Sequence, residues 1–148
     1  MNTTATTLSQ VTVTLKEHIE LIKQWGVLQT PELKGGDEAR IKAIFGGQAQ
    51  YAQKLIDTYK DAGISPKKVY AQSFDINDIL YWIKHEPAFA KNAVYLDPID
   101  PANGIPRMSV ERLTELKKAG VQIISPSYNY LLDVDANGNI VPSQYALD

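Results

Sequence analysis

At 148 residues, with 44% hydrophobic and 22% charged side chains, the chain has the composition of an ordinary globular domain and enough length for one hydrophobic core. Fifteen basic against 17 acidic side chains leave a formal net charge of −2 and no basic block for a nucleic-acid backbone, so we expect no nucleic-acid partner. The lack of cysteine excludes disulfides, cysteine-based zinc sites and thiol nucleophiles.

The N-terminal segment 1–13 lacks the basic start and the continuous apolar run of a signal peptide, and we expect it to be irregular. The compartment stays unknown. No later segment approaches the roughly 20 consecutive apolar residues of a membrane span. Thr14 and Glu17 form a capping box, and apolar residues then recur at helical spacing until Gly26. A helix is therefore predicted over 14–25, at the start of a domain that runs to residue 148.

The rest of the chain alternates short apolar runs with helical patterns. The apolar runs predict strands at 27–34, 69–74, 93–97 and 121–125. The helical patterns predict helices at 41–62, with a break or kink at Gly46 and Gly47, from Asp75 to about His85, and from Ser109 to Gly120. Trp25 and Trp82 are interpreted as core residues on helix faces.

This alternation predicts an α/β fold, because strands separated by helices pair in parallel through right-handed crossovers. About four β-α units are present, and a closed TIM-type (β/α) barrel needs eight. We therefore predict a partial TIM-type barrel, which leaves open sheet edges.

The first predicted strand ends in TPELKGG, which places charges on an otherwise apolar segment. Alternation puts Glu32 and Lys34 on one face and Gln29, Pro31 and Leu33 on the other. At a barrel mouth, a buried carboxylate needs a metal ion or the neighbouring ammonium as its partner. The simpler alternative is a Glu32–Lys34 ion pair at a solvated strand end. Pro31 removes one hydrogen bond from the ladder.

Two more polar side chains follow predicted strands. Gln72 lies near the end of strand 69–74 and could line the same mouth, or it could bond a side chain of a neighbouring strand. Tyr128 opens the cluster Tyr128-Asn129-Tyr130 after the fourth strand and could line a glycerol or alcohol pocket, or pack within its loop.

The segment DVDANGNI, residues 133–140, fits the first eight positions of a calcium loop, but Gln144 replaces the glutamate of position twelve. Asn137-Gly138 between apolar residues also predicts a β-hairpin, and this is the interpretation that we favour. The two histidines, His18 and His85, are interpreted as helix-surface residues.

Three motifs in this order, TPELKGG, then VYAQSFDINDILYWIKHEP, then VQIISPSYNYLL, resemble the glycerophosphodiester phosphodiesterase family. The resemblance covers about 15–148 and corresponds to the fourth to seventh strands of the family's barrel. It implies metal-dependent hydrolysis of glycerophosphodiesters to glycerol 3-phosphate and an alcohol, in proteins that are often periplasmic or secreted. It further implies Glu32 as a ligand of Ca²⁺ or Mg²⁺ and Lys34 beside the substrate phosphate. Gln72 and Tyr128, from their positions after predicted strands, are the other candidate substrate-binding residues.

The chain departs from the family in lacking its His-Arg-Gly first strand, the acidic metal ligands that follow it, and the second catalytic histidine strand. We therefore assign no catalytic residue in this chain and expect it to be inactive alone. The alternative is a non-catalytic binding or assembly module that forms a homodimer and so covers its open sheet edges.

Overall fold

The computed structural model of the protein describes residues 13–147, so the predicted irregular segment at 1–13 falls almost wholly outside the described residues. The helices are α1 Leu15–Trp25, α2 Glu38–Phe45, α3 Gln48–Asp61, α4 Ile76–His85, α5 Pro87–Ala90, α6 Val110–Lys118, α7 Tyr128–Leu131 and α8 Gln144–Leu147, with 3-10 turns at Pro66–Lys68 and Pro101–Asn103. The strands are β1 Gln72–Ser73, β2 Val94–Leu96, β3 Ile123–Ser125, β4 Leu132–Val134 and β5 Ile140–Pro142. Within residues 13–147, no helix has both the length and the apolar character that a bilayer crossing requires.

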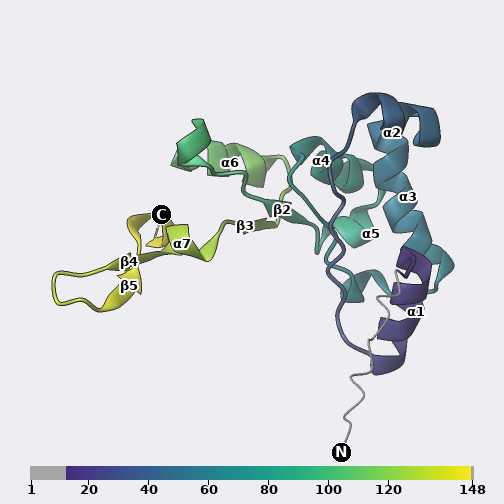
Figure 1. The fold of residues 1–148 in the computed structure, drawn as a ribbon, viewed down its shortest axis with the longest axis horizontal. Helices are drawn as coiled ribbons and strands as arrows, with labels where there is room; N and C mark the ends of the chain where they lie inside the picture. Colours follow the sequence, from purple (N-terminus) through teal and green to yellow (C-terminus); the bar gives the residue numbers. More distant parts are fainter. Residues whose placement is uncertain (1–12, 148) are drawn as a thin grey trace, which may run out of the picture.

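The strands form two separate sheets. β1, β2 and β3 pair in parallel in chain order, with Gln72 opposite Val94 and Val94 opposite Ile123. β4 and β5 pair as an antiparallel hairpin, which confirms the predicted β-hairpin around Asn137-Gly138. Figure 1 shows α1 to α5 gathered on one side of the molecule, while the hairpin projects from the opposite side.

The prediction of a partial TIM-type (β/α) barrel is wrong. The parallel sheet has three strands of two or three residues each, and it is mixed with helices and a separate hairpin. Residues 27–34, which were expected to form its first strand, make only isolated parallel bridges, Gln29 with Val69 and Glu32 with Gln72. After β3 the chain turns into α7 and the hairpin, where another β-α unit would have had to follow.

Pro31 accounts for the missing first strand. Hydrogen bonds of a parallel ladder are present on both sides of it: Gln29 N to Lys68 O at 2.8 Å, Tyr70 N to Gln29 O at 2.8 Å, Gln72 N to Pro31 O at 2.9 Å and Leu33 N to Gln72 O at 2.8 Å. The bond that would continue this pattern runs from the nitrogen of residue 31 to Tyr70 O, and proline has no hydrogen to donate. The pairing is therefore interrupted at its centre.

The structure confirms the predicted helices. Their capping residues are present at the expected positions and determine where the helices begin and end. The capping box at the start of α1 is present, with Thr14 N donating to Glu17 Oε2 at 2.7 Å. Gly46 and Gly47, at φ 93° and 140°, separate α2 from α3 where the break was expected, in backbone conformations that favour glycine. Asp75 caps α4 and Ser109 caps α6 through bonds to backbone N–H groups.

The core lies between the parallel sheet and the helices that cover one of its faces. Its largest fully buried side chains include Trp82 and Ile79 of α4 and Tyr59 and Ile56 of α3. The prediction for Trp82 is confirmed, and its indole Nε1 donates to Ala52 O at 3.0 Å. The prediction for Trp25 is wrong: it is 66% exposed, because it ends a helix of which only Ile19 is buried.

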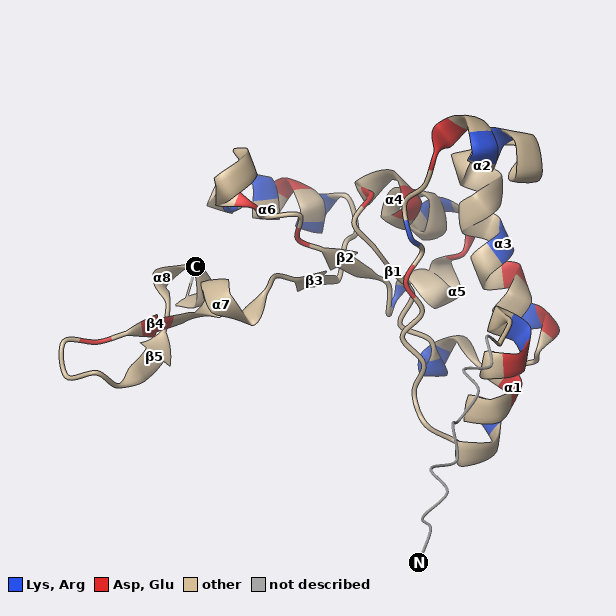
Figure 2. Ribbon diagram, viewed as in Figure 1, with Lys and Arg blue, Asp and Glu red and all other residues tan. Residues whose placement is uncertain are grey.

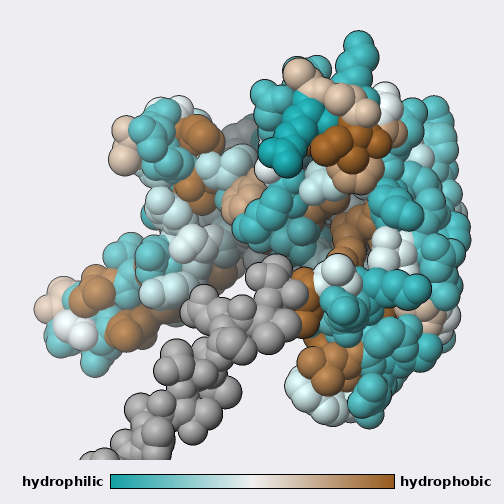
Figure 3. Space-filling model, turned by 45° about the vertical axis from the view of Figure 1, so that its right-hand side comes forward, coloured by the Kyte–Doolittle hydropathy of each residue, from teal (hydrophilic) through white to brown (hydrophobic). Residues whose placement is uncertain are grey.

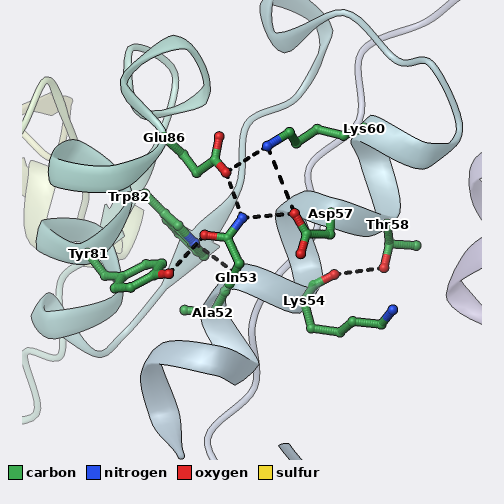
Figure 4. Close-up of polar contacts among 9 residues, drawn as sticks. All are labelled: Ala52, Gln53, Lys54, Asp57, Thr58, Lys60, Tyr81, Trp82 and Glu86. Atoms are coloured by element: carbon green, nitrogen blue, oxygen red, sulfur yellow. Dashed lines mark hydrogen bonds and ion pairs between the residues drawn. The ribbon is translucent and has the colours of Figure 1, made fainter.

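The side chain of Gln53 links α3 to the end of α4 (Figure 4). Its Nε2 donates to Asp57 Oδ1 at 2.9 Å and to Glu86 Oε1 at 2.6 Å, while its Oε1 accepts from the Tyr81 hydroxyl at 2.9 Å. The Lys60 ammonium adds an ion pair to Glu86 at 2.8 Å. The donors and acceptors of these side chains are used within the network. We therefore regard it as a structural clamp that holds α3 against the end of α4.

Replacing Pro31 with alanine is expected to restore the missing ladder bond. The new N–H at position 31 faces Tyr70 O, so its hydrogen exchange should be slowed to the level of the Gln72 amide. The change in the free energy of unfolding should be small. The added hydrogen bond stabilises the folded protein by about 1 kcal/mol. Alanine in place of proline gives the unfolded chain more conformational entropy, which lowers stability by a similar amount. Fast exchange at residue 31 would show that the proline does not cause the interruption.

Candidate functional site

The charged end of segment 27–34 contains an ion pair. Lys34 Nζ lies 2.8 Å from Glu32 Oε1, and the side chains are 74% and 21% exposed, respectively. Figure 2 shows the acidic and the basic residue next to each other on the segment that runs beside β1. Gln29 and Leu33 are buried on the other face, so the predicted alternation is confirmed. The arrangement is the ion pair that was considered as the simpler alternative.

Gln72 lies beside Glu32 across the backbone bridge that joins these two residues. Its Nε2 donates to Thr30 O at 3.4 Å, so the amide bonds the backbone of the neighbouring segment and not a side chain. The fold thus brings together a carboxylate, an ammonium and a carboxamide at one exposed strand end. The ammonium and the amide can both donate to an oxyanion.

Tyr128, the remaining predicted substrate-binding residue, is not part of this group. It is exposed at the start of α7, which follows β3. Segment 27–34 bridges to the β1 side, so the two lie at opposite edges of the sheet. Within residues 13–147 it makes no hydrogen bond, ion pair or ring contact with Glu32, Lys34 or Gln72. Three of the four predicted site residues are therefore assembled.

The described residues do not by themselves fit the Ca²⁺ or Mg²⁺ that the family resemblance implies. Nowhere in residues 13–147 do three or more His, Cys, Asp or Glu side chains gather closely enough to hold a metal ion. Glu32 supplies a single carboxylate, which already accepts from Lys34. Because Ca²⁺ takes about six to eight oxygen ligands, this one carboxylate does not by itself make a calcium site.

The other candidates for chemistry have structural roles. His18 is exposed on α1, and His85 is exposed and stacks on the Tyr81 ring at 4.5 Å, so both histidines lie on helix surfaces as predicted. In the hairpin, Asp135 accepts from Asn139 N at 2.8 Å and from Asn137 N at 2.9 Å, and these bonds, the first above all, keep the pKa of its carboxyl below the ordinary range. Its carboxylate closes the turn.

A buried polar cluster on the helix-covered side of the sheet was missed in the sequence. The Asp78 carboxylate accepts from Ser73 Oγ and from Gln48 Nε2, both at 2.8 Å, and Asp75 N donates to Ser73 Oγ at 3.0 Å. Burial raises the pKa of Asp78 above its ordinary value, against the lowering effect of these hydrogen bonds. The sequence signal was a carboxylate in the first turn of a helix, which more often lies in solvent.

A second missed cluster joins the C-terminal helices to the end of β2. Asp97 is buried directly after β2 and accepts from the Tyr145 hydroxyl at 2.6 Å. Burial, together with this carboxylate, raises the pKa of Tyr145 to about 12. The guanidinium of Arg107 lies 5.7 Å from the ring centroids of both Tyr130 and Tyr145.

Comparison with known proteins finds a relative for most of the chain. An "Extracellular protein" of Arthroderma benhamiae is 39% identical over 135 residues, which are 89% of this chain and 54% of that protein. The chain thus spans about half the length of the curated relative that it matches. No family model and no solved structure matches the sequence.

Asp78→Asn is expected to change how stability depends on pH. Unfolded Asp78 ionises near 3.8, whereas the folded protein retains this proton to higher pH. As pH rises above 3.8, the wild-type protein therefore loses stability until folded Asp78 has also ionised. The asparagine variant lacks this loss, so its stability relative to wild type should increase between pH 4 and pH 7.

The measurement is urea unfolding of both proteins across this pH range. Asp61→Asn, at the exposed end of α3, is the matched control for removing one negative charge. A stability difference between wild type and Asp78→Asn that is the same at every pH would contradict the raised pKa.

Proposed function

We propose that this chain is the phosphate-binding part of a phosphodiesterase similar to the glycerophosphodiester phosphodiesterases, and that it hydrolyses no phosphodiester by itself. The observation that carries the proposal is the Glu32–Lys34 pair beside Gln72 at an exposed strand end. The order of the three motifs, of which TPELKGG supplies this pair, supports it.

The chemistry of the pair suits a phosphodiester. The Lys34 side chain is 74% exposed, and a phosphate oxygen can replace the Glu32 carboxylate as its partner at little cost because solvent-exposed ion pairs contribute little stability. Gln72 offers an N–H whose present bond is long, at 3.4 Å. A phosphate at this strand end thus gains two donors without breaking a buried interaction.

Hydrolysis requires more than this group provides. A water must be activated and the leaving alcohol protonated, which calls for a general base and acid or a metal ion. In residues 13–147, both histidines lie on helix surfaces and no acidic cluster fits a metal. The relative from Arthroderma benhamiae extends well beyond the matched part, and a chain of that length has room for the missing groups.

The expected result is binding without turnover. In titrations followed by ¹H–¹⁵N NMR, glycerol 3-phosphate should shift the Lys34 and Gln72 amides, and Lys34→Ala should abolish these shifts. Glu32→Gln removes the competing carboxylate and should strengthen binding up to about fivefold, the equivalent of an exposed ion pair. Lys117→Ala, which removes an exposed cation on α6, is the control.

The same samples should release no choline from glycerophosphocholine with Ca²⁺ or Mg²⁺. Metal-dependent turnover that Glu32→Ala abolishes would refute the claim of inactivity. Binding that survives in Lys34→Ala would refute the phosphate site.

A second candidate function is a non-catalytic module that associates with a second copy of itself. The observation that favours it is an exposed apolar side chain on the segment that carries the charge pair. Leu28 is 58% exposed, and alternation places it on the same sheet face as Glu32. Burial of this face between two copies would remove the Leu28 side chain from water.

This candidate predicts a dimer in sedimentation velocity, with Leu28→Asp shifting the population to monomer by at least about tenfold in the dissociation constant. Val134→Asp is the control, because Val134 is equally an exposed apolar residue but lies on the hairpin. A monomer at every concentration up to about 1 mM, the dissociation constant of a weak complex, would exclude this interface. A loss of dimer in both variants would exclude it as well.

A further inference from the structure

A cavity of about 470 Å³ lies where the loop after Leu33, the end of β1 and the start of α4 meet. Its lining includes Leu33, Ser73 and Tyr95, the side chains on the helix-covered face of the sheet. Glu32 and Gln72 point to the opposite face. The cavity is therefore separate from the candidate phosphate site, and its size falls within the range of small-molecule sites.

The hydroxyl of Tyr95 is the first polar group of the lining. Tyr95 is only 6% exposed and lines the cavity, and none of the hydrogen bonds among residues 13–147 uses its hydroxyl. Because this oxygen is not one of the fully buried unpaired atoms, it faces the open space of the cavity and is accessible to a ligand. Burial raises the pKa of this hydroxyl, so it is neutral and can both donate and accept.

The cluster around Asp78 supplies further polar groups with capacity to spare. Gln48 uses one N–H on the Asp78 carboxylate, which leaves its second N–H and its carbonyl oxygen. Each oxygen of Asp78 accepts one hydrogen bond, from Gln48 or from Ser73, and has room for another. These bonds also hold the side chains in place before any ligand arrives.

The lining determines which class of ligand fits. It contains two carboxylates, Asp75 and Asp78, and neither lysine nor arginine, so an anion would be repelled. The donors of Gln48 and Tyr95 would have no acceptor in a purely cationic ligand. The walls of Leu33 and Ile76, with the half-exposed ring of Phe74 at the edge, offer apolar surface to C–H groups.

We propose that this cavity binds a small neutral polyhydroxylated ligand of about monosaccharide size. Its hydroxyl groups donate to Asp78 and Asp75 and accept from Gln48 and Tyr95. Its C–H face lies against Phe74 and Ile76. Because none of these side chains belongs to the Glu32–Lys34 group, the proposal does not depend on the phosphodiesterase assignment.

The test is a ¹H–¹⁵N NMR titration of the full chain with glucose and with glycerol. Saturable shifts are expected for the Gly35 and Gly36 amides and for the side-chain amide of Gln48. Tyr95→Phe keeps the ring in the core and removes only the hydroxyl, so it should weaken glucose binding about fivefold, as expected for one neutral hydrogen bond. Phe74→Ala should also weaken it.

Tyr70→Phe is the matched control, because Tyr70 lies two residues before β1 on the opposite sheet face. It should bind glucose like the wild type. Choline is titrated in parallel as a cationic comparison. The proposal is overturned if neither glucose nor glycerol causes saturable shifts at these amides, if Tyr95→Phe binds glucose as well as wild type, or if choline binds more tightly than glucose. The last result would make the cavity a cation site. Glycerol 3-phosphate shifts at Lys34 should be the same in Tyr95→Phe, so failure here and failure of the phosphate site are distinguishable.

Discussion

The backbone pairing between residues 29–33 and the approach to β1 determines where everything else in the candidate site lies. Four hydrogen bonds hold this segment, and their alternation aims Leu33 into the core and Glu32 away from it. Had the segment slipped by one residue, Glu32 would have entered the core and Leu33 the solvent, which burial energetics oppose. The interruption at Pro31 is tolerated because the bonds on both sides of it preserve this register.

The two faces of the small sheet carry different chemistry for the same geometric reason. Neighbouring residues at a strand end point to opposite sides, so Gln72 joins the charge pair while Ser73 joins the buried cluster around Asp78. The exposed face offers a cation and an amide, and the covered face offers carboxylates, an amide and a phenol. Neighbouring residues of the same strand end thus belong to two chemically distinct surfaces, one on each face of the sheet.

Much of this local structure could be predicted from the sequence, because caps, glycines and alternation act over a few residues. Thr14, Gly46 and Asp75 predicted where helices begin or end, and alternation in TPELKGG put Glu32 and Lys34 on one face, where the ion pair was one of two alternatives. The barrel could not be settled this way, because sheet closure depends on which distant strands pair. The burial of Asp78 and the exposure of Trp25 could not be predicted either, since both depend on what packs against one helix face.

The hydrophobic surface of the projecting hairpin, visible in Figure 3, is a further result of tertiary placement, because Val134 and Ile140 would be core residues in most strands.

The clamp at Gln53 shows how strictly a partly buried position can select between side chains of the same shape. Its nitrogen faces the carboxylates of Asp57 and Glu86, and its oxygen faces the phenol of Tyr81. Glutamate has the same length and volume, but there it would bring a third carboxylate against two others and replace two attractive contacts with repulsion. Deamidation of this one side chain would therefore weaken the polar contact between α3 and the end of α4, although the side chain would keep its size and shape.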